Sequence, residues 1–343
     1  MATEIETDAV DPTLVDTVNN LFSRTGPTER DPVTGVAFDR TLWNKLDELG
    51  LARLTAPEDQ GGSGAGWRES AAVVGAAASH AVSLPLVEHD LLAGWLLAQA
   101  GLPGDAHVRT ACVLHAGHAT AVPWARHAER IVVLWQAHTW LVADVPASEM
   151  SIVEGSNLAG EPRDDVRVDM AGLSGVPVPD NVANELVVRG ALARAVQVCQ
   201  ALERIVDLCV EHATTRVQFG RPLAKFQALQ QQLADAAAES ALARAAVNAA
   251  VRRMDTDAAD LSAINFAVAT ARSCVGHAAS LVVRHAHQIH GAIGTTLEHP
   301  LHRFTLPALS WRAEYGSVQH WDDVVADAAL AAGGHGLWQR ITR

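Results

Sequence analysis

The chain has 343 residues, 49% of them apolar, and is long enough to form two or three domains around a large core. It carries 39 acidic and 26 basic residues, a formal net charge of −13, which leaves no extended basic surface for nucleic acid or anionic lipid. The N-terminus has no apolar signal core, and no uninterrupted apolar run approaches the ~20 residues that span a bilayer, so we expect no contact with a membrane.

The cysteines indicate a reducing compartment. Cys112, Cys199, Cys209 and Cys274 are widely spaced and include no CxxC pair. Because Cys199 and Cys209 fall on an apolar helical stripe, we expect buried free thiols rather than disulfides. A cytoplasmic location follows as an expectation.

Residues 1–112 are expected to form a helical domain, because Leu42, Leu46, Leu49 and Leu54 recur near helical spacing. The glycine-rich stretch TAPEDQGGSGAGW follows. No strand pattern precedes it and no Lys-Ser/Thr pair follows, so it is typical of a structural connector rather than a phosphate loop.

Residues 113–180 change to short β-rich runs, ACVLHAG, RIVVLWQ, TWLVADV and VRVDMAG, which predict a small, reduced β domain. Helical periodicity returns in residues 181–343, with apolar steps of three and four that predict a packed C-terminal helical bundle. Two stripes carry this pattern: Leu192, Val196, Cys199, Leu202, Val206 and Cys209, and then Leu261, Ile264, Val268, Ala271, Val275, Ala278 and Val282.

Two clusters in the bundle could hold a nucleotide. In TTRVQFGRPL, Arg216 precedes Phe219 by three residues near a helix end, and this spacing would place a phosphate-pairing guanidinium and an aromatic ring on one face. In AHQIHGAIG, Gln288 ends a long periodic helix, and Gly291 and Gly294 would let a ligand approach the backbone closely.

With these two clusters the chain resembles the acyl-CoA dehydrogenase family, and the stretch from Trp43 to Gly64 is similar to that family's first helical domain. The resemblance implies a mainly α fold with an N-terminal helical domain, a middle β domain and a C-terminal four-helix bundle. It also implies FAD as cofactor, α,β-dehydrogenation of an acyl-CoA thioester, and electron-transfer flavoprotein as a possible acceptor.

The resemblance further implies that five residues contact the flavin of a neighbouring subunit: Arg216, Phe219, Gln288, Gly291 and Gly294. The alternative is structural. Arg216 would then cap a helix, Phe219 would belong to the core, and the glycines would only turn the chain.

The chain departs from the family in its β region. The family's TEP and GSD-like stretch and WIT-like strand, which hold the flavin ring, have no counterpart in VPWARHAERIVVLWQAHTWLVADVP. The chain therefore resembles the short partner subunit of heteromeric, steroid-type acyl-CoA dehydrogenases, with a longer subunit completing a heterotetramer. Two alternatives remain, a self-sufficient homo-oligomer and a flavin-free scaffold subunit.

The catalytic base is displaced relative to both branches of the family. Family chemistry needs a carboxylate of raised pKa near the thioester. In one branch its expected position is Tyr315, with Glu314 adjacent, and a one-residue shift turns a helical side chain by roughly 100°. In the other branch the position is Gly190, with Glu185 upstream. Glu314 is the candidate base of a self-sufficient enzyme, whereas Glu298 is expected to make a structural or ligand contact.

Five histidines lie near the second cluster, but they lack companion Cys or acidic ligands at usual spacing, and an HExxH motif is absent. The sequence therefore predicts no metal site. These histidines are His285, His287, His290, His299 and His302.

Overall fold

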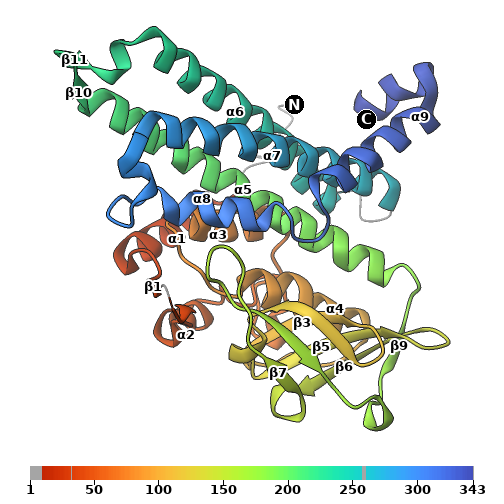
Figure 1. Ribbon diagram of the computed structural model, residues 1–343. Helices are drawn as coiled ribbons and strands as arrows, with labels where there is room; N and C mark the ends of the chain where they lie inside the picture. Colours follow the sequence, from red (N-terminus) through yellow and green to blue (C-terminus); the bar gives the residue numbers. More distant parts are fainter. Residues whose placement is uncertain (1–9, 32, 257–259, 343) are drawn as a thin grey trace, which may run out of the picture.

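The computed structural model describes residues 10–31, 33–256 and 260–342. Figure 1 shows helices at the N-terminus, a β domain in the middle of the sequence and a bundle of long helices at the C-terminal end. The predicted mainly α fold with a small β domain is confirmed.

The first two N-terminal helices each start where an aspartate caps them, Asp11 in the first and Asp39 in the second. The helices and 3-10 or π turns are α1 (Pro12–Thr25), α2 (Arg40–Glu48), η1 (Glu58–Gln60), α3 (Trp67–Ser79), the π-helix η2 (Val87–Gly94) and α4 (Trp95–Gln99). A short hairpin joins α1 to α2 and consists of β1 (Arg30–Asp31) and β2 (Gly35–Val36). The carboxylate of Asp39 accepts the backbone N–H of Leu42 and so caps α2. Of the predicted leucine stripe, Leu49 is exposed because it lies at the C-cap after α2 has ended.

The glycine-rich stretch before α3 is a tightly folded connector. A Cβ on Gly62 would lie 2.0 Å from the carbonyl oxygen of Ala56, so only glycine fits where the chain packs back on itself. Gly61 caps η1 in the left-handed region, with φ of 79°. The glycines therefore shape the connection to α3.

The β domain is built from two small sheets. One has the order β3-β5-β6-β9, with β3 and β5 parallel, and the other has the order β4-β8-β7. The strands are β3 (Arg109–Leu114), β4 (His118–Pro123), β5 (Arg130–Gln136), β6 (Trp140–Pro146), β7 (Ser151–Val153), β8 (Arg163–Arg167) and β9 (Val176–Val178). Sequence reasoning missed β4 and also β7 and β9, which have only three residues each. It also placed the run VRVDMAG too late, because β8 ends at Arg167 and Met170–Gly172 forms a 3-10 turn.

The C-terminal bundle buries the predicted apolar stripes. Its helices are α5 (Val182–Thr215), α6 (Gln227–Thr256), α7 (Leu261–His290), α8 (His302–Trp311) and α9 (Val318–Thr342). The helices α5, α6 and α7 lie side by side, α8 packs on α5, and α9 packs on α7 (Figure 1). Gly333, with φ of 64°, kinks α9. Cys112, Cys199 and Cys209 are buried, Cys274 is partly buried, and all four are free thiols.

One segment, Leu261–Thr295, is long and apolar enough by composition to cross a membrane. More than half of its most apolar window is buried inside the protein, where α7 packs against α5, α6 and α9. A central helix of a soluble bundle has this same composition. The helix therefore gives no reason to place the chain in a membrane.

Candidate functional site

The two positions where the family would carry its base meet in space. Tyr315 follows α8 in a turn with φ of 55°, and its ring lies against Gly190 of α5. A Cβ on Gly190 would lie 2.5 Å from Cε1 of that ring. An aromatic ring thus fills the space beside the missing side chain, and neither position supplies a carboxylate.

Glu314, the adjacent candidate, is held by two arginines. Nε of Arg163 donates to Oε1 at 2.8 Å, and Nε of Arg194 donates to Oε2 at 2.7 Å. Burial by itself raises the pKa of the Glu314 carboxyl, but Arg194 and Arg163 outweigh it and bring that pKa below its ordinary value. The side chain is 19% exposed. A carboxylate in this state is a weak proton acceptor.

These contacts belong to a chain of five charged side chains that joins all three parts of the molecule. Its members, in spatial order, are Glu88, Arg194, Glu314, Arg163 and Glu161. The guanidinium of Arg194, only 2% exposed, also donates to Glu88 at 2.5 Å. The other end is fixed because the indole N–H of Trp311 donates to Glu161 at 2.7 Å. Buried charges are tolerated only when paired and hydrogen-bonded in this way.

Arg272 of α7 holds the turn that carries Glu314 in place through hydrogen bonds to its backbone. Its guanidinium donates to the backbone carbonyls of Arg312 and Glu314, each at 2.8 Å. Burial lowers the pKa of Arg272 to about 10, which still leaves it charged at neutral pH. The backbone around Tyr315 is therefore held in place by a buried cation.

A cleft of about 720 Å³ opens between the β domain and this turn. Strands β3 and β4, residues 156–158, the end of α8, and Arg163, Glu314 and Tyr315 line it. The volume falls within the ~300–1,000 Å³ typical of small-molecule sites. Its walls are mostly aliphatic. Among its polar side chains, Arg163 and Glu314 pair within the charge chain and Asn157 donates to it, and His115, His118, Thr120 and Ser156 also line the cleft.

The first predicted cluster lies on a hairpin, which corrects the expectation that Arg216 and Phe219 share a helical face. The helix α5 ends at Thr215, Arg216 is extended, and the strands β10 (Val217–Gln218) and β11 (Arg221–Pro222) follow. Phe219 and Gly220, with φ of 52° and 76°, form the tight turn between them. The three-residue spacing places two side chains on one face only within a helix, and α5 ends at Thr215, directly before Arg216.

Both key side chains of this hairpin point to solvent. Phe219 is 91% exposed, so the alternative that places it in the core is wrong. The Arg216 guanidinium makes no hydrogen bond or ion pair with the residues that the structure describes. An exposed arginine beside an exposed aromatic ring is a composition typical of interfaces and phosphate contacts.

The second cluster has an open part and a packed part. Gln288 is exposed near the end of α7, and Gly291 has φ of 62° with nothing within 4 Å of its Cβ position, so a ligand could approach the backbone there. Gly294 corrects the prediction, because it is buried. Its Cβ would lie 2.7 Å from the Cβ of His290 and 3.2 Å from Leu301. Gly294 thus serves packing within this chain.

The two clusters share one end of the bundle, remote from the cleft. At about 1.5 Å per residue, Arg216 lies roughly 33 Å along the α5 axis from Arg194. Figure 1 shows the β10–β11 hairpin at the end of α5 that points away from the β domain. The clusters and the cleft are therefore two separate surfaces of the chain.

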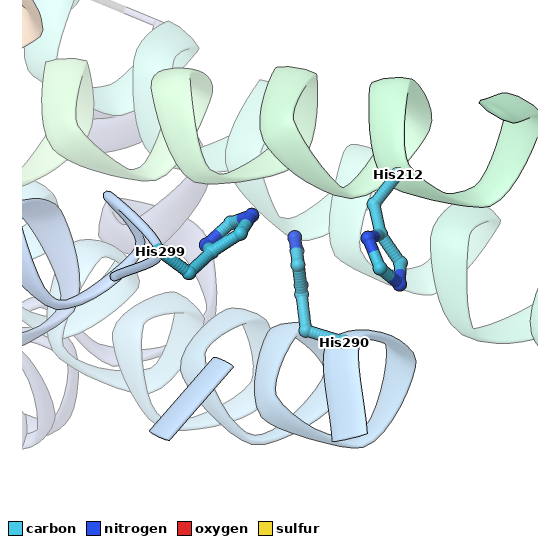
Figure 2. A group of neighbouring side chains, drawn as sticks. All are labelled: His212, His290 and His299. Carbon is cyan, nitrogen blue, oxygen red and sulfur yellow. The ribbon is translucent and has the colours of Figure 1, made fainter. Parts of the chain in front are cut away.

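Three histidines converge beside the clusters. The ring of His290, on α7, lies between those of His212 on α5 and His299 in the loop before α8, with centroid distances of 4.5 Å to each (Figure 2). One ring nitrogen from each residue comes within 4.8 Å of the other two. His285, His287 and His302 from the sequence-based set are not part of this group.

The remaining acidic candidates are at the surface. Glu298 is exposed, and Glu185, in the first turn of α5, accepts the amide N–H of Asn181 at 2.6 Å. Sequence reasoning missed Arg163, Arg194 and His212, whose partners lie far away in the sequence. A charged residue in an otherwise apolar helical stripe was the available signal, because Arg194 has Gly190, Ala191 and Val198 three or four residues away.

Two family models match the chain. The model described as acyl-CoA dehydrogenase, N-terminal domain, matches residues 13–103, and the one described as acyl-CoA dehydrogenase, C-terminal domain, matches residues 181–335. Neither covers residues 104–180, where the β domain lies. Acyl-CoA dehydrogenase FadE27 of Mycobacterium tuberculosis is 28% identical over 317 residues, which cover 79% of this chain and 83% of that relative.

Solved structures share the fold over nearly the whole chain. A chain of the ChsE4-ChsE5 complex from Mycobacterium tuberculosis superposes with a TM-score of 0.83 at 23% identity, covering 95% of this chain and 99% of that chain. A variant of the Tcur3481-Tcur3483 steroid ACAD gives a TM-score of 0.83 at 20% identity, covering 94% and 98%.

Proposed function

Because this chain belongs to the acyl-CoA dehydrogenase family, whose members are oxidoreductases that act on a CH–CH bond, we propose that it is a subunit that completes the FAD site of a longer partner. The partner supplies the catalytic base and most of the flavin contacts. This chain contributes the end of its helical bundle that carries Arg216, Phe219, Gln288 and Gly291 to the partner's FAD site.

The observation that carries the proposal is the exposed pair Arg216 and Phe219, remote from the chain's own cleft. A guanidinium can pair with pyrophosphate oxygens through two parallel hydrogen bonds, and an aromatic ring can stack on a base. Gln288 and the open backbone at Gly291 add a hydrogen-bonding group and close approach. These residues fit the nucleotide part of FAD when a neighbouring chain brings it.

The chain's own cleft fits the reacting part of the cofactor poorly. Its two charged side chains, Arg163 and Glu314, are bonded within the charge chain, and Glu314, with a lowered pKa, cannot readily take a proton from the thioester's α carbon. FAD, when bound, accepts the hydride of the dehydrogenation. We place that step in the partner's cleft and assign Glu314 a structural role.

The relatives suggest the substrate class and the partners. The Tcur3481-Tcur3483 steroid ACAD and the ChsE4-ChsE5 complex are two-component proteins by name. By analogy, we propose a bulky, steroid-type acyl-CoA substrate, a heterotetrameric assembly and electron-transfer flavoprotein as acceptor. The free thiols agree with a cytoplasmic location.

The test is flavin content with and without a longer family member. We expect the isolated chain to bind FAD weakly or not at all, and co-purification with the partner to give a flavin-loaded complex that oxidises a steroid-type acyl-CoA. Stoichiometric FAD on the isolated chain, with dehydrogenase activity, would support the self-sufficient homo-oligomer. A complex whose flavin content is unchanged when Arg216 and Phe219 are both replaced would support the flavin-free scaffold.

A further inference from the structure

The three histidines beside the clusters, His212, His290 and His299, come from three segments that the sequence separates widely. Their rings lie in a row, and Figure 2 shows nitrogens of His290 and His299 directed into the space between the rings. A ligand placed between the rings could contact a nitrogen of each residue.

His290 gives the clearest indication. It is 5% exposed, and its Nδ1 lies 2.8 Å from the carbonyl oxygen of Ala286, so Nδ1 carries the proton and donates it. Its Nε2 is buried and has no hydrogen-bond partner. A buried lone pair without a partner costs free energy, and a ring nitrogen fixed by a backbone carbonyl at its other side is the usual arrangement of a metal-bound histidine.

We propose that His212, His290 and His299 bind a divalent transition-metal ion of the Zn²⁺ type, with a fourth position open to water. Imidazole nitrogens suit zinc, copper, cobalt and nickel, and three histidines with one open position form a known zinc coordination set. Such an ion would tie the end of α5 to the end of α7 and to the loop before α8.

The three rings lie close to one another, but their nitrogens are farther apart than in a zinc site with an ion bound. Zn–N bonds of about 2.0–2.1 Å in a tetrahedron put the nitrogens about 3.3–3.4 Å apart, whereas here they lie within 4.8 Å of one another. Side-chain movements of about 1 Å close this gap. His299 must also give up the hydrogen bond of 3.2 Å that its Nδ1 accepts from the backbone of Leu301, so that the proton can move to Nδ1.

The charge state favours binding. Burial lowers the pKa of all three rings, that of His290 to about 4, so the imidazoles are neutral and need not release a proton at neutral pH. Two charges lie nearby. The Glu211 carboxylate acts on His299 and attracts a cation, whereas Arg216 acts on His212 and repels one.

Calorimetry with Zn²⁺ on the full-length chain, stripped with a chelator and free of flavin, tests the site. We expect one Zn²⁺ per chain and a rise in Tm of a few degrees. His212→Phe and His299→Phe keep a ring in place and should weaken Zn²⁺ binding at least tenfold. His285→Phe, which lies on α7 with His290 but outside the group, is the control and should bind as the parent chain does.

Two results would overturn the site. One is a parent chain that binds no Zn²⁺. The other is Zn²⁺ binding that His212→Phe and His299→Phe leave unchanged, which would assign the ion to other surface groups. Since the two residues are partly exposed, their variants should fold, and circular dichroism confirms it. Flavin is absent from the experiment, so its outcome is independent of the proposed FAD role.

Discussion

The Tyr315 ring rests on Gly190, and the distance from a Cβ at Gly190 to Cε1 of that ring would be only 2.5 Å. In the family resemblance, each of these positions is where one branch carries its catalytic carboxylate. Their contact brings these two positions together in this chain, one on α5 and the other in the turn after α8. In this chain that point holds an aromatic ring.

Gly190→Ala should destabilise the protein by about 1–3 kcal/mol, because the added methyl group overlaps the Tyr315 ring. The sign of this change is informative, because replacing glycine by alanine inside a helix normally stabilises a protein by about 1 kcal/mol. Urea denaturation measures the change. Gly172→Ala, where no atom lies within 4 Å of the Cβ position, is the control. If Tyr315→Ala does not relieve the loss in the double variant, the overlap is not its cause.

Glu314→Gln should lower the free energy of unfolding by about 3 kcal/mol, because it breaks a paired charge between the buried Arg163 and Arg194. Denaturation of the isolated chain measures this. Glu48→Gln, which removes an exposed pairing with Lys45, should change stability by less than about 1 kcal/mol. Equal effects of the two substitutions would show that the buried charge chain contributes little.

The same Glu314→Gln substitution should leave flavin reduction nearly unchanged in the assembled complex. Loss of a true general base commonly costs about 100-fold to 10,000-fold in rate. Single-turnover bleaching of flavin absorbance with a bulky acyl-CoA isolates the chemical step from product release. A loss of a hundredfold or more, with FAD content and assembly intact, would make Glu314 the base and place the chemistry in this chain.

Two carboxyls, the partly buried Glu314 and the buried Asp90, should give opposite pH dependences of stability. Arg194 and Arg163 bring the pKa of Glu314 below its ordinary 4.5, so its stabilisation is present above pH 4.5 and is lost as pH falls through the folded-state pKa. Burial raises the pKa of Asp90 from 3.8 to about 6, so its contribution is present below 3.8 and is lost as pH rises to about 6.

Unfolding free energies measured from pH 3 to 7 check both signs. Asp90→Asn should remove the decline between about pH 4 and 6, and Glu314→Gln should flatten the fall on the acid side. The assignments fail if either variant keeps the parent profile.

Arg216→Lys should weaken FAD retention in the complex by about 1–3 kcal/mol, because an ammonium cannot reproduce a two-pronged pairing with pyrophosphate. The fold should be unaffected, since the guanidinium contacts none of the described residues through a hydrogen bond or ion pair. Fluorescence of released flavin measures retention. Arg244→Lys, on the exposed face of α6, is the matched control. Early melting with flavin fully retained would identify Arg216 as a purely structural residue.

The sequence alone determined the helical N-terminal region, the β-rich middle and the long periodic helices, because apolar spacing reports which face of an element is buried. It also placed the two candidate clusters near the ends of long helices, and the structure has Arg216 directly after α5 and Gln288 near the end of α7. It did not determine where the Phe219 side chain points. The helix α5 ends at Thr215, so Arg216 and Phe219 belong to the β10–β11 hairpin and do not share a helical face.

Only the tertiary structure decided which distant groups meet. Arg163, Arg194 and Glu314 lie on three different segments, and their pairing depends on the packing of the β domain against the bundle. His212 and His290 likewise meet only because α5 and α7 pack side by side. Side-chain periodicity is a local property of the backbone, whereas electrostatic pairing and ligand geometry depend on the distances between segments that folding brings together.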